Sequence, residues 1–381
     1  MKKVLLRGPL LTASGYGEHS RQFFRWLESR NDIELKVQCL NWGNTTWYID
    51  TDIEEGLIGR IMSKTNFDVQ NESFDISIQV QLPDEWDNSL ARYNIGVSAF
   101  IETTKCSKAW FECCNKMDKI IAPSKHALKS VLANGNLDKR AHVVNEPLNP
   151  LLSKHKTDFK LNLEPDFNFL IISQLTDLNS SHDRKNIVET IKAFCKKFDG
   201  NKDVGLVIKT NIGRSTMADR RRTKGLLEKI VKENRKTAFP KINMIHGLLS
   251  PSEMYEIYSH PKIKCLISLT RGEGYGLPLM EAASCELPVL ATNWSGHLDF
   301  LKDFIKIKYT LVPIPELKAD GRIFEKNTFW AEPSIEDFQK KLGWVIKNYD
   351  MLKRSAKKQS KRINRDFSQE AFNKKMNEIL K

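Results

Sequence analysis

Short apolar segments alternate with segments of helical periodicity along most of this chain, and that alternation constrains the fold most strongly. FNFLIIS (167–173) and VGLVIKT (204–210) have the composition of buried strands, whereas NIVETIKAFCKKF (186–198) between them repeats its apolar residues at helical spacing. Strands that are joined by helices pair in parallel and need helices over both faces of the sheet. The sequence therefore predicts an α/β protein built on doubly wound parallel sheets.

The alternation occurs twice, and the chain of 381 residues is long enough for two domains. Between the two series, residues 148–165 are polar, contain two prolines and lack a clear period. We therefore expect an N-terminal domain at 1–150, a linker at 151–165 and a C-terminal domain at 166–359, with the terminal helix at about 360–381 packing back onto the first domain.

The charge and the cysteines narrow the class of protein. The formal net charge of +13 favours nucleotides, nucleic acid or an acidic membrane surface as partners, and it does not choose among them. No run of about eighteen apolar residues predicts a transmembrane helix, and the N-terminal segment is typical of a first strand, not of a signal peptide. The seven cysteines show no metal-like spacing, so we expect free thiols in a cytoplasmic protein.

Residues 351–367 predict an amphipathic helix with a basic face. The simpler interpretation of such a face is solvation, and the alternative is contact with the phosphates of DNA or with an anionic membrane. The apolar side of the helix carries Leu352, Ala356, Ile363 and Phe367, and the basic side carries Lys353, Arg354, Lys357, Lys358, Lys361, Arg362 and Arg365.

The stretch RGEGYGLPLMEAASCELPV (271–289) combines two acids with a glycine turn. It follows an apolar strand, and Pro278 suits the first position of a helix. The free N–H groups of that helix, with the glycine turn before it, form a binding site for a diphosphate. Glu273 in the turn and Glu281 in the first helical turn can accept hydrogen bonds from the vicinal hydroxyls of a ribose or hexose. The simpler interpretation is a loop acid and an acid that stabilises the helix dipole.

The same stretch carries a resemblance to a known family. EGYGLPLME followed by AASCELPVLAT resembles the E-x7-E signature of retaining glycosyltransferases with the GT-B fold, family 4 type. The resemblance implies two Rossmann-like domains facing a central cleft and a hexosyltransferase that uses a nucleotide-diphosphate sugar with retention at the anomeric carbon. Further matches to the family are SGYGEHSR (14–21), HDRKNIVETIKAF (182–194), LVIKT (206–210), MIHGLLSPSEMYEIYSH (244–260) and FWAEPSIEDFQKKL (329–342).

The resemblance implies roles for the residues that match the family's motifs. It places Glu273 beside the donor sugar and Glu281 on the nucleotide ribose. Lys185, with Arg184 beside it, would neutralise the leaving phosphate, because fixed cations stabilise such developing charge without reorganising. With these cations present, neither a metal ion nor any other cofactor is expected. The diphosphate would lie against the backbone around Gly274, Tyr275, Gly276 and Leu277.

One position departs from the family's pattern. Many members have an arginine shortly after the first strand of the C-terminal domain, whereas this chain has the uncharged Gln174. Arg184 or Lys209 could supply the second cation, or phosphate binding could be weaker. Lys209 could equally be an ordinary lysine at the end of a strand.

The N-terminal half contributes weaker candidates. Gly15 and Gly17 would let the loop after the first strand approach the donor, or they form a plain strand–helix turn. Many relatives place a histidine near the substrate in the region of Glu102. Glu102 and the adjacent Thr103 are therefore candidates on the acceptor side.

Three functions remain open from the sequence. The first is transfer of a sugar to a glycan, a lipid-linked or another small hydroxyl acceptor. The second is a DNA-modifying glycosyltransferase that acts on a hydroxylated base, which the net charge permits. The third is a catalytically silent protein that binds a nucleotide sugar, which only Gln174 favours. No obligate protein partner is implied, and a location at the periphery of a membrane is compatible with all three.

Overall fold

The computed structural model describes residues 1–66, 68–137, 140–152, 157–175, 177, 179–211 and 213–380. The chain forms two compact units, each described here by itself. Unit 1 comprises Met1–Asn149, Ala319–Thr328 and Phe367–Lys381, and unit 2 comprises Pro150–Lys318 and Phe329–Asp366. The expected linker at 151–165 includes residues 153–156, which lie outside the described residues.

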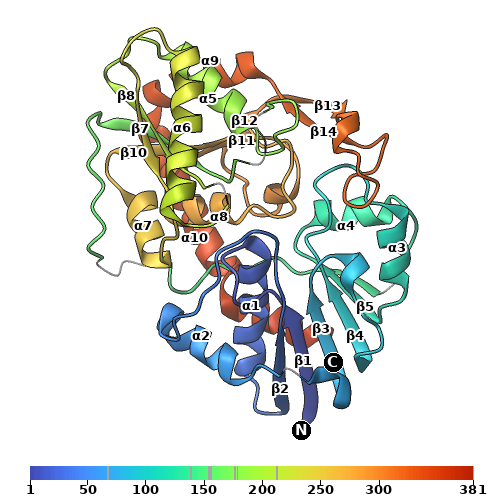
Figure 1. Cartoon of the computed structure of the whole chain (residues 1–381). Helices are drawn as coiled ribbons and strands as arrows, with labels where there is room; N and C mark the ends of the chain where they lie inside the picture. Colours follow the sequence, from blue (N-terminus) through green and yellow to red (C-terminus); the bar gives the residue numbers. More distant parts are fainter. Residues whose placement is uncertain are drawn as a thin grey trace. The chain divides into compact units, whose positions relative to one another are not determined.

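Unit 1 is built on a six-stranded sheet of order β2-β1-β3-β4-β5-β6, in which every strand pair is parallel (Figure 1). Its strands are β1 (Lys2–Gly8), β2 (Ile33–Cys39), β3 (Phe74–Val80), β4 (Ala91–Val97), β5 (Lys119–Ala122) and β6 (Ala141–Val143). Its helices are α1 (Gly15–Glu28), α2 (Ile53–Ser63), α3 (Lys108–Asn115), α4 (Lys125–Leu132) and α11 (Gln369–Ile379).

Helices cover both faces of this sheet, because successive residues of a strand point to opposite sides. Val4 and Leu6 of β1 pack in one core with α1, α2 and α11, whereas Leu5 between them packs on the other face. In β5, Ile120 and Ala122 join the core that α3 and α4 form. Unit 1 is thus a doubly wound sheet, as the alternation of strands and helices predicts.

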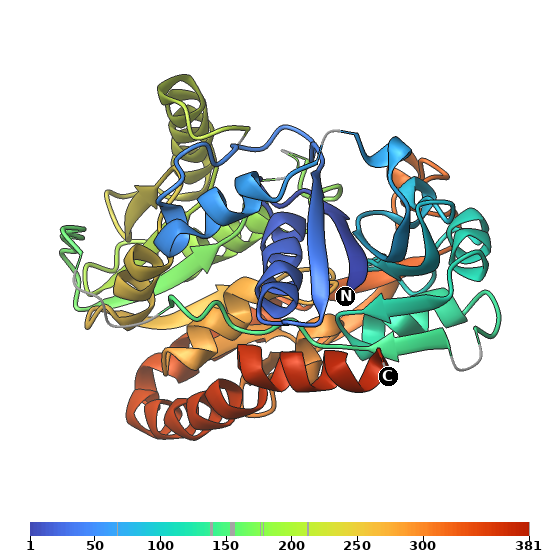
Figure 2. The ribbon, with the colours of Figure 1, turned by 90° about the horizontal axis from the view of Figure 1, so that it is seen from below.

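The last helix, α11, is part of the core of unit 1 (Figure 2). The ring of Phe372 meets the ring of Phe23 of α1 edge-on, with 5.1 Å between their centroids. The indole N–H of Trp26 donates to the side-chain oxygen of Asn377 at 2.9 Å. Helices α1 and α11 are therefore neighbours, although more than 300 residues separate them in the sequence.

Unit 2 contains a second six-stranded parallel sheet, of order β12-β11-β10-β7-β8-β9, and an antiparallel hairpin of β13 and β14. Its strands are β7 (Phe167–Ile172), β8 (Val204–Lys209), β9 (Lys241–Ile245), β10 (Ile263–Ser268), β11 (Val289–Thr292), β12 (Ile305–Ile307), β13 (Tyr309–Pro313) and β14 (Phe329–Pro333). Its helices are α5 (Ile187–Lys197), α6 (Met217–Asn234), α7 (Pro251–Ser259), α8 (Leu277–Ser284), α9 (Ile335–Lys347) and α10 (Tyr349–Asp366).

The order of the strands sets the layers of unit 2. From β7 the chain moves outward through α5 to β8, and from β10 it moves outward in the other direction through α8 to β11. Because crossover connections are right-handed, these two helices must lie on opposite faces of the sheet. Phe169 and Ile171 of β7 pack with α5, α6 and α9 in the main core, so unit 2 is also doubly wound.

The basic helix predicted at 351–367 is α10, and its apolar residues Leu352, Ala356 and Ile363 are buried. Two of its basic residues take part in the fold, since Lys353 donates to the carbonyl of Glu286 and Arg362 to that of Phe300. The remaining basic side chains, those of Arg354, Lys357, Lys358, Lys361 and Arg365, are exposed.

Candidate active site

The strand order of unit 2 reverses between β7 and β10, which are adjacent in the sheet. In open α/β sheets, ligands bind outside the carboxyl ends of the strands at such a reversal. The segment after β7 carries Arg184 and Lys185, and the segment after β10 carries Glu273. Topology alone therefore brings these three side chains to one edge of the sheet.

Lys185 and Glu273 form a close ion pair at this edge. The ammonium of Lys185 donates to both carboxylate oxygens of Glu273, at 2.8 and 2.6 Å. The guanidinium of Arg184 lies 3.7 Å from the same carboxylate and donates to the carbonyl of Gly272 at 2.6 Å. Burial alone would raise the pKa of Glu273, but Lys185 and Arg184 outweigh it and lower that pKa to about 2. Glu273 is thus a carboxylate at neutral pH.

Arg271 ties the two segments together, and the sequence gives no sign of this role. Its guanidinium is buried and donates to the carbonyls of Ser180 and Asp183, each at 2.7 Å. It also forms two hydrogen bonds with the carboxylate of Glu332 in β14, at 2.6 and 2.9 Å. The backbone N–H of Arg271 donates to the carbonyl of Arg184 at 2.8 Å. The segment that bears Lys185 is therefore fixed directly to the turn that bears Glu273.

The start of α5 explains why asparagine follows Lys185. Asn186 has a φ of 56°, in the left-handed region that glycine and asparagine tolerate best. The carboxylate of Asp183 accepts from the N–H groups of Ile187 and Val188, at 2.6 and 3.4 Å, and so caps the helix. The chain therefore turns at Asn186, directly after Lys185, and α5 begins at the next residue.

The glycine turn leads into α8 through Gly276, whose φ is +102°. A side chain at this φ would be strained, so glycine is required here. Pro278 occupies the second helical position, not the first as predicted, and Glu281 lies in the second turn, not the first. The helix dipole acts mainly within the first turn, which weakens the interpretation of Glu281 as a dipole-stabilising acid.

Glu281 is held by a tyrosine that the sequence does not single out. The hydroxyl of Tyr258 in α7 donates to the Glu281 carboxylate at 2.7 Å, and the tyrosine side chain is fully buried. Lys209, at the end of β8, donates to the carbonyl of Gly247 at 2.7 Å. Burial lowers the pKa of Lys209, and the nearby Glu281 opposes that shift. Lys209 is thus near Glu281, whereas Arg184 is near Glu273.

Among the residues predicted to surround the diphosphate, some offer only backbone groups to a ligand, because their side chains are packed in the protein. The ring of Tyr275 is buried against Phe300, and its hydroxyl donates to the sulfur of Met280, so only its backbone is a candidate for phosphate binding. Leu277 begins α8, where the first N–H groups of a helix have no intrahelical acceptor. Gly274 lies so close to Gly296 that a Cβ on Gly296 would come within 2.2 Å of the Gly274 carbonyl oxygen.

A further segment, which the sequence analysis did not identify, holds the glycine turn in place through hydrogen bonds to Glu273. The hydroxyl of Ser295 accepts from the N–H of Glu273 at 2.9 Å, and the N–H of Gly296 donates to the Glu273 carbonyl at 2.9 Å. Next to them, His297 is fully buried, with its Nε2 at 2.8 Å from the carbonyl of Thr292. Its Nδ1 has no hydrogen-bond partner among the described residues. Burial lowers the pKa of His297, so it is neutral near pH 7.

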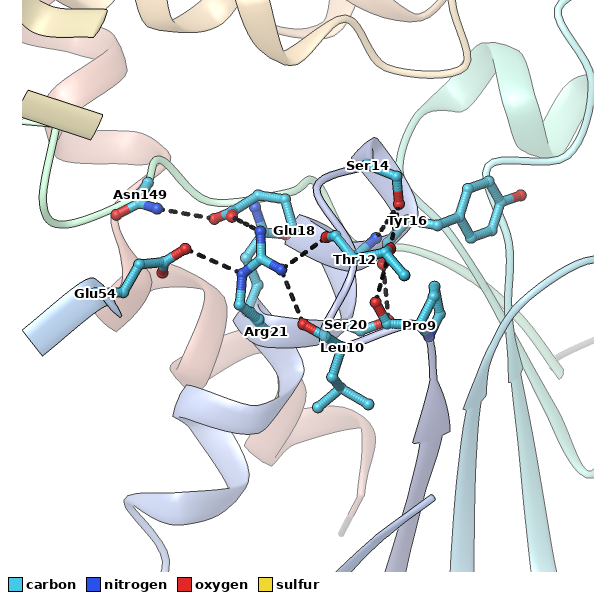
Figure 3. Close-up of polar contacts among 12 residues, drawn as sticks. Pro9, Leu10, Thr12, Ser14, Tyr16, Glu18, Ser20, Arg21, Glu54 and Asn149 are labelled. Carbon is cyan, nitrogen blue, oxygen red and sulfur yellow. Dashed lines mark hydrogen bonds and ion pairs between the residues drawn. The ribbon is translucent and has the colours of Figure 1, made fainter. Parts of the chain in front are cut away.

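In unit 1, the loop after β1 is locked by a buried charge cluster, shown in Figure 3. The guanidinium of Arg21 donates to the carbonyls of Leu10 and Thr12, at 2.9 and 3.0 Å, and pairs with Glu18 at 2.8 Å and Glu54 at 3.1 Å. A Cβ on Gly17 would come within 2.1 Å of the Thr12 carbonyl oxygen. Gly17 is thus needed for packing within the loop.

Of the other candidates in unit 1, Gly15 has open space where a Cβ would lie. Glu102 is half-buried, and its carbonyl oxygen lies 3.4 Å from Nε2 of His126. Thr103 is fully buried and donates its hydroxyl to the carbonyl of Lys105 at 3.0 Å, so this side chain stabilises a turn. In unit 2, Gln174 is exposed, next to the end of β7.

Among the described residues, no group of three or more histidine, cysteine, aspartate or glutamate side chains could hold a metal ion. In the same part of the chain, no helix is both long enough and apolar enough to cross a bilayer.

Comparison with known proteins defines the class. Residues 178–362, which contain all the candidate site residues of unit 2 except Gln174, match the family Glycosyl transferases group 1. A search of curated proteins found no significant match. The matched region makes up slightly less than half of the chain, so these residues are similar to a glycosyl transferases group 1 domain, and the solved structures below give the whole chain a GT-B fold.

Similar solved structures span the whole chain. A glycosyltransferase from Rickettsia africae superposes with a TM-score of 0.64 at 14% identity, covering 99% of this chain and 97% of the other. Sucrose-phosphate synthase from Thermosynechococcus elongatus gives 0.64 at 12% identity, with 100% and 98% covered. The Anabaena protein HepE in complex with UDP and glucose gives 0.61 at 10% identity, with 100% and 99% covered. At these identities the likeness establishes the fold, and both sheets have the topology that the GT-B expectation required.

Proposed function

We propose that this protein is a retaining glycosyltransferase of the family 4 type, which transfers a sugar from a nucleotide-diphosphate sugar to a hydroxyl acceptor. The observation that carries the proposal is the contact of Lys185 with both oxygens of Glu273, at 2.8 and 2.6 Å, at the point where the strand order reverses. Glu281 lies eight residues beyond Glu273, on the helix whose N-terminus begins at the same turn.

The arrangement suits departure of a nucleoside diphosphate. In the proposed reaction the bond between the anomeric carbon and the diphosphate oxygen breaks, the acceptor oxygen bonds to that carbon, and the acceptor proton passes to the departing phosphate. An ammonium carries a full positive charge and three N–H donors, so Lys185 beside Glu273 is suited to contact with a phosphate oxygen of the donor. Preorganised donors of this kind stabilise the charge that develops on the leaving group.

Arg184 is the better candidate for the second cation that Gln174 cannot supply. It lies 3.7 Å from the carboxylate of Glu273, beside Lys185. Lys209 is held by the carbonyl of Gly247 near Glu281, the acid proposed to bind the ribose. Three fixed cations at one sheet edge support diphosphate binding without a divalent metal, so we propose a metal-independent reaction.

UDP-glucose is the first donor to try, because similar structures of HepE contain UDP and UDP-glucose. The experiment measures release of nucleoside diphosphate from UDP-, GDP- and ADP-sugars in the presence of EDTA. The native chain should turn over at least one donor, and Glu273→Ala and Lys185→Ala should lose turnover. Lys196→Ala, an exposed lysine of α5, is the matched control and should retain it.

Two results would oppose the proposal. Saturable nucleotide binding without release, with saccharide acceptors and with duplex DNA added in turn, would favour a protein that only binds nucleotide sugars. Inversion at the anomeric carbon of the product, measured by NMR, would exclude the retaining mechanism. Release stimulated only by duplex DNA would identify the acceptor as a modified base.

A further inference from the structure

A groove of about 610 Å³ lies in unit 2, at the opposite edge of the sheet from Glu273. Val289 and Ile305, which line it, are the first residues of β11 and β12, so the groove lies at the amino ends of the strands. Leu352 and Ala356 of α10 complete an apolar floor. No residue that lines the groove belongs to the candidate active site.

The rim of the groove is basic. Four lysines line it, against two acids, Asp303 and Asp337. Two of the ammonium groups have partners in the fold, since Lys341 pairs with Asp337 at 2.7 Å and Lys302 donates to the carbonyl of Leu298 at 2.6 Å. The other two lysines, Lys306 and Lys340, are exposed.

Two large apolar side chains of the helices α9 and α10 are exposed, and one of them lines the groove. Trp344 of α9 lines the groove and is 40% exposed, and Met351 at the start of α10 is 45% exposed. Between 335 and 366, the two helices carry ten lysines and arginines against four acids, a large share of the excess charge of the chain. An exposed indole among lysines is not explained by packing of unit 2.

We propose that this face of unit 2 docks on an anionic lipid bilayer, with Trp344 at the interface and Lys306 and Lys340 on lipid phosphates. Indole rings concentrate at the boundary between headgroups and acyl chains, where one end is apolar and the other is wet. Lysines extend their apolar stems along such a surface and place the ammonium among the headgroups. Nucleic acid would match the charge but not the apolar floor and the exposed indole and thioether.

This docking would act independently of the proposed glycosyl transfer. The groove lies at the amino edge of the sheet and Glu273 at the carboxyl edge, so a bilayer on the groove leaves the donor-binding edge of unit 2 uncovered. This face differs from the basic face of residues 351–367, for which the sequence leaves membrane contact open as an alternative to solvation. The contact is centred on the side of α10 that adjoins α9, and not on the outermost basic face of α10.

The test is co-sedimentation of the full chain with vesicles, without donor or acceptor. Phosphatidylcholine vesicles with about one third phosphatidylglycerol should bind the native chain, and pure phosphatidylcholine vesicles should not. Removal of one lysine charge should weaken binding about fivefold, so Lys306→Gln/Lys340→Gln should weaken it more than tenfold. The control, Lys229→Gln/Lys232→Gln on α6, removes two exposed charges of the same unit and should bind as the native chain does.

A second readout locates the contact at the indole. Lipids brominated on the acyl chain should quench part of the tryptophan fluorescence of the native chain, and Trp344→Phe should lose that quenching. The proposal is wrong if vesicles do not bind, if both double variants weaken binding equally, or if Trp344→Phe is quenched as strongly as the native chain. Binding of duplex DNA that the Lys306→Gln/Lys340→Gln pair abolishes, with no vesicle binding, would assign the face to nucleic acid instead.

Discussion

The protonation of Glu273 gives a prediction at the scale of the residue. Its pKa in the folded chain is about 2, below the ordinary value of 4.5, so the Lys185 pair stabilises the fold while the carboxylate is charged. The difference in free energy of unfolding between the native chain and Glu273→Gln should be largest above about pH 4.5. It should shrink as the pH falls toward 2, by as much as about 3 kcal/mol in all.

Urea unfolding at several pH values measures this difference. A difference that is the same at pH 6 and pH 3 would show that folding does not shift the pKa of Glu273, and it would contradict a stabilising effect of the ion pair. The direction is fixed by the sign of the shift: a depressed carboxyl pKa stabilises the fold at higher pH and loses that effect on acidification.

Tyr258 gives a second prediction at this scale, because its hydroxyl donates to Glu281 at 2.7 Å. Tyr258→Phe should leave the Glu281 carboxylate in place but less well oriented, and so weaken binding of the nucleotide about three- to tenfold. We expect the change in the KM for the donor, with kcat nearly unaltered. Tyr93→Phe, in β4 of unit 1, is the control and should leave the KM unchanged. An unchanged KM in Tyr258→Phe would show that this hydrogen bond does not orient Glu281 for binding of the nucleotide.

At the scale of the element, Arg271 joins the turn after β10, the segment after β7 and strand β14. Arg271→Ala would leave the Glu332 carboxylate and two buried carbonyls without their donor, and should destabilise the chain by about 3–5 kcal/mol. Arg271→Lys should recover only part of this, since an ammonium cannot make the bidentate contact. Thermal unfolding of both variants, beside the exposed Arg222→Ala, measures the effect, and equal melting of all three would contradict it.

The elements also show what sequence can and cannot predict. Helix α5 spans Ile187–Lys197, within the segment 186–198 that the sequence predicts to be helical, because its apolar residues recur at helical spacing. Strands β7 and β8 were predictable as short apolar runs, and the family motifs assigned Lys185 and Glu273 to the same donor site, without their direct contact. The contact of Arg271 with Glu332 spans 61 residues and leaves no trace in local pattern. The position of Glu281 in the second turn depended on a left-handed Gly276, which a residue list does not reveal.

At the scale of the whole molecule, neither unit is a single continuous stretch of the sequence. Ala319–Thr328 belongs to unit 1 although unit 2 precedes and follows it in the sequence. In that segment Arg322 pairs with Asp84 at 2.6 Å and Glu85 at 3.0 Å. Domain boundaries predicted from composition fall where the sequence becomes more polar. Composition therefore cannot identify a ten-residue segment that returns to unit 1 and forms two ion pairs there.

The terminal helix α11 supplies the prediction at this scale. Met376 is fully buried in the core of unit 1. Met376→Ala should lower the free energy of unfolding by about 2–5 kcal/mol, because the side chain leaves a cavity. Lys374→Ala, exposed on the same helix, should change it by less than about 0.5 kcal/mol. If urea unfolding finds the two variants equally stable, α11 does not hold the core of unit 1.

The central claim is that Lys185, beside Glu273, binds the diphosphate of a nucleotide sugar. Calorimetric titration with UDP tests it most directly, because it needs no acceptor. The native chain and Lys196→Ala should bind UDP with the same affinity, and Lys185→Ala should bind it about tenfold to a hundredfold more weakly, as the loss of a charge-assisted hydrogen bond requires. Native affinity in Lys185→Ala would contradict the account.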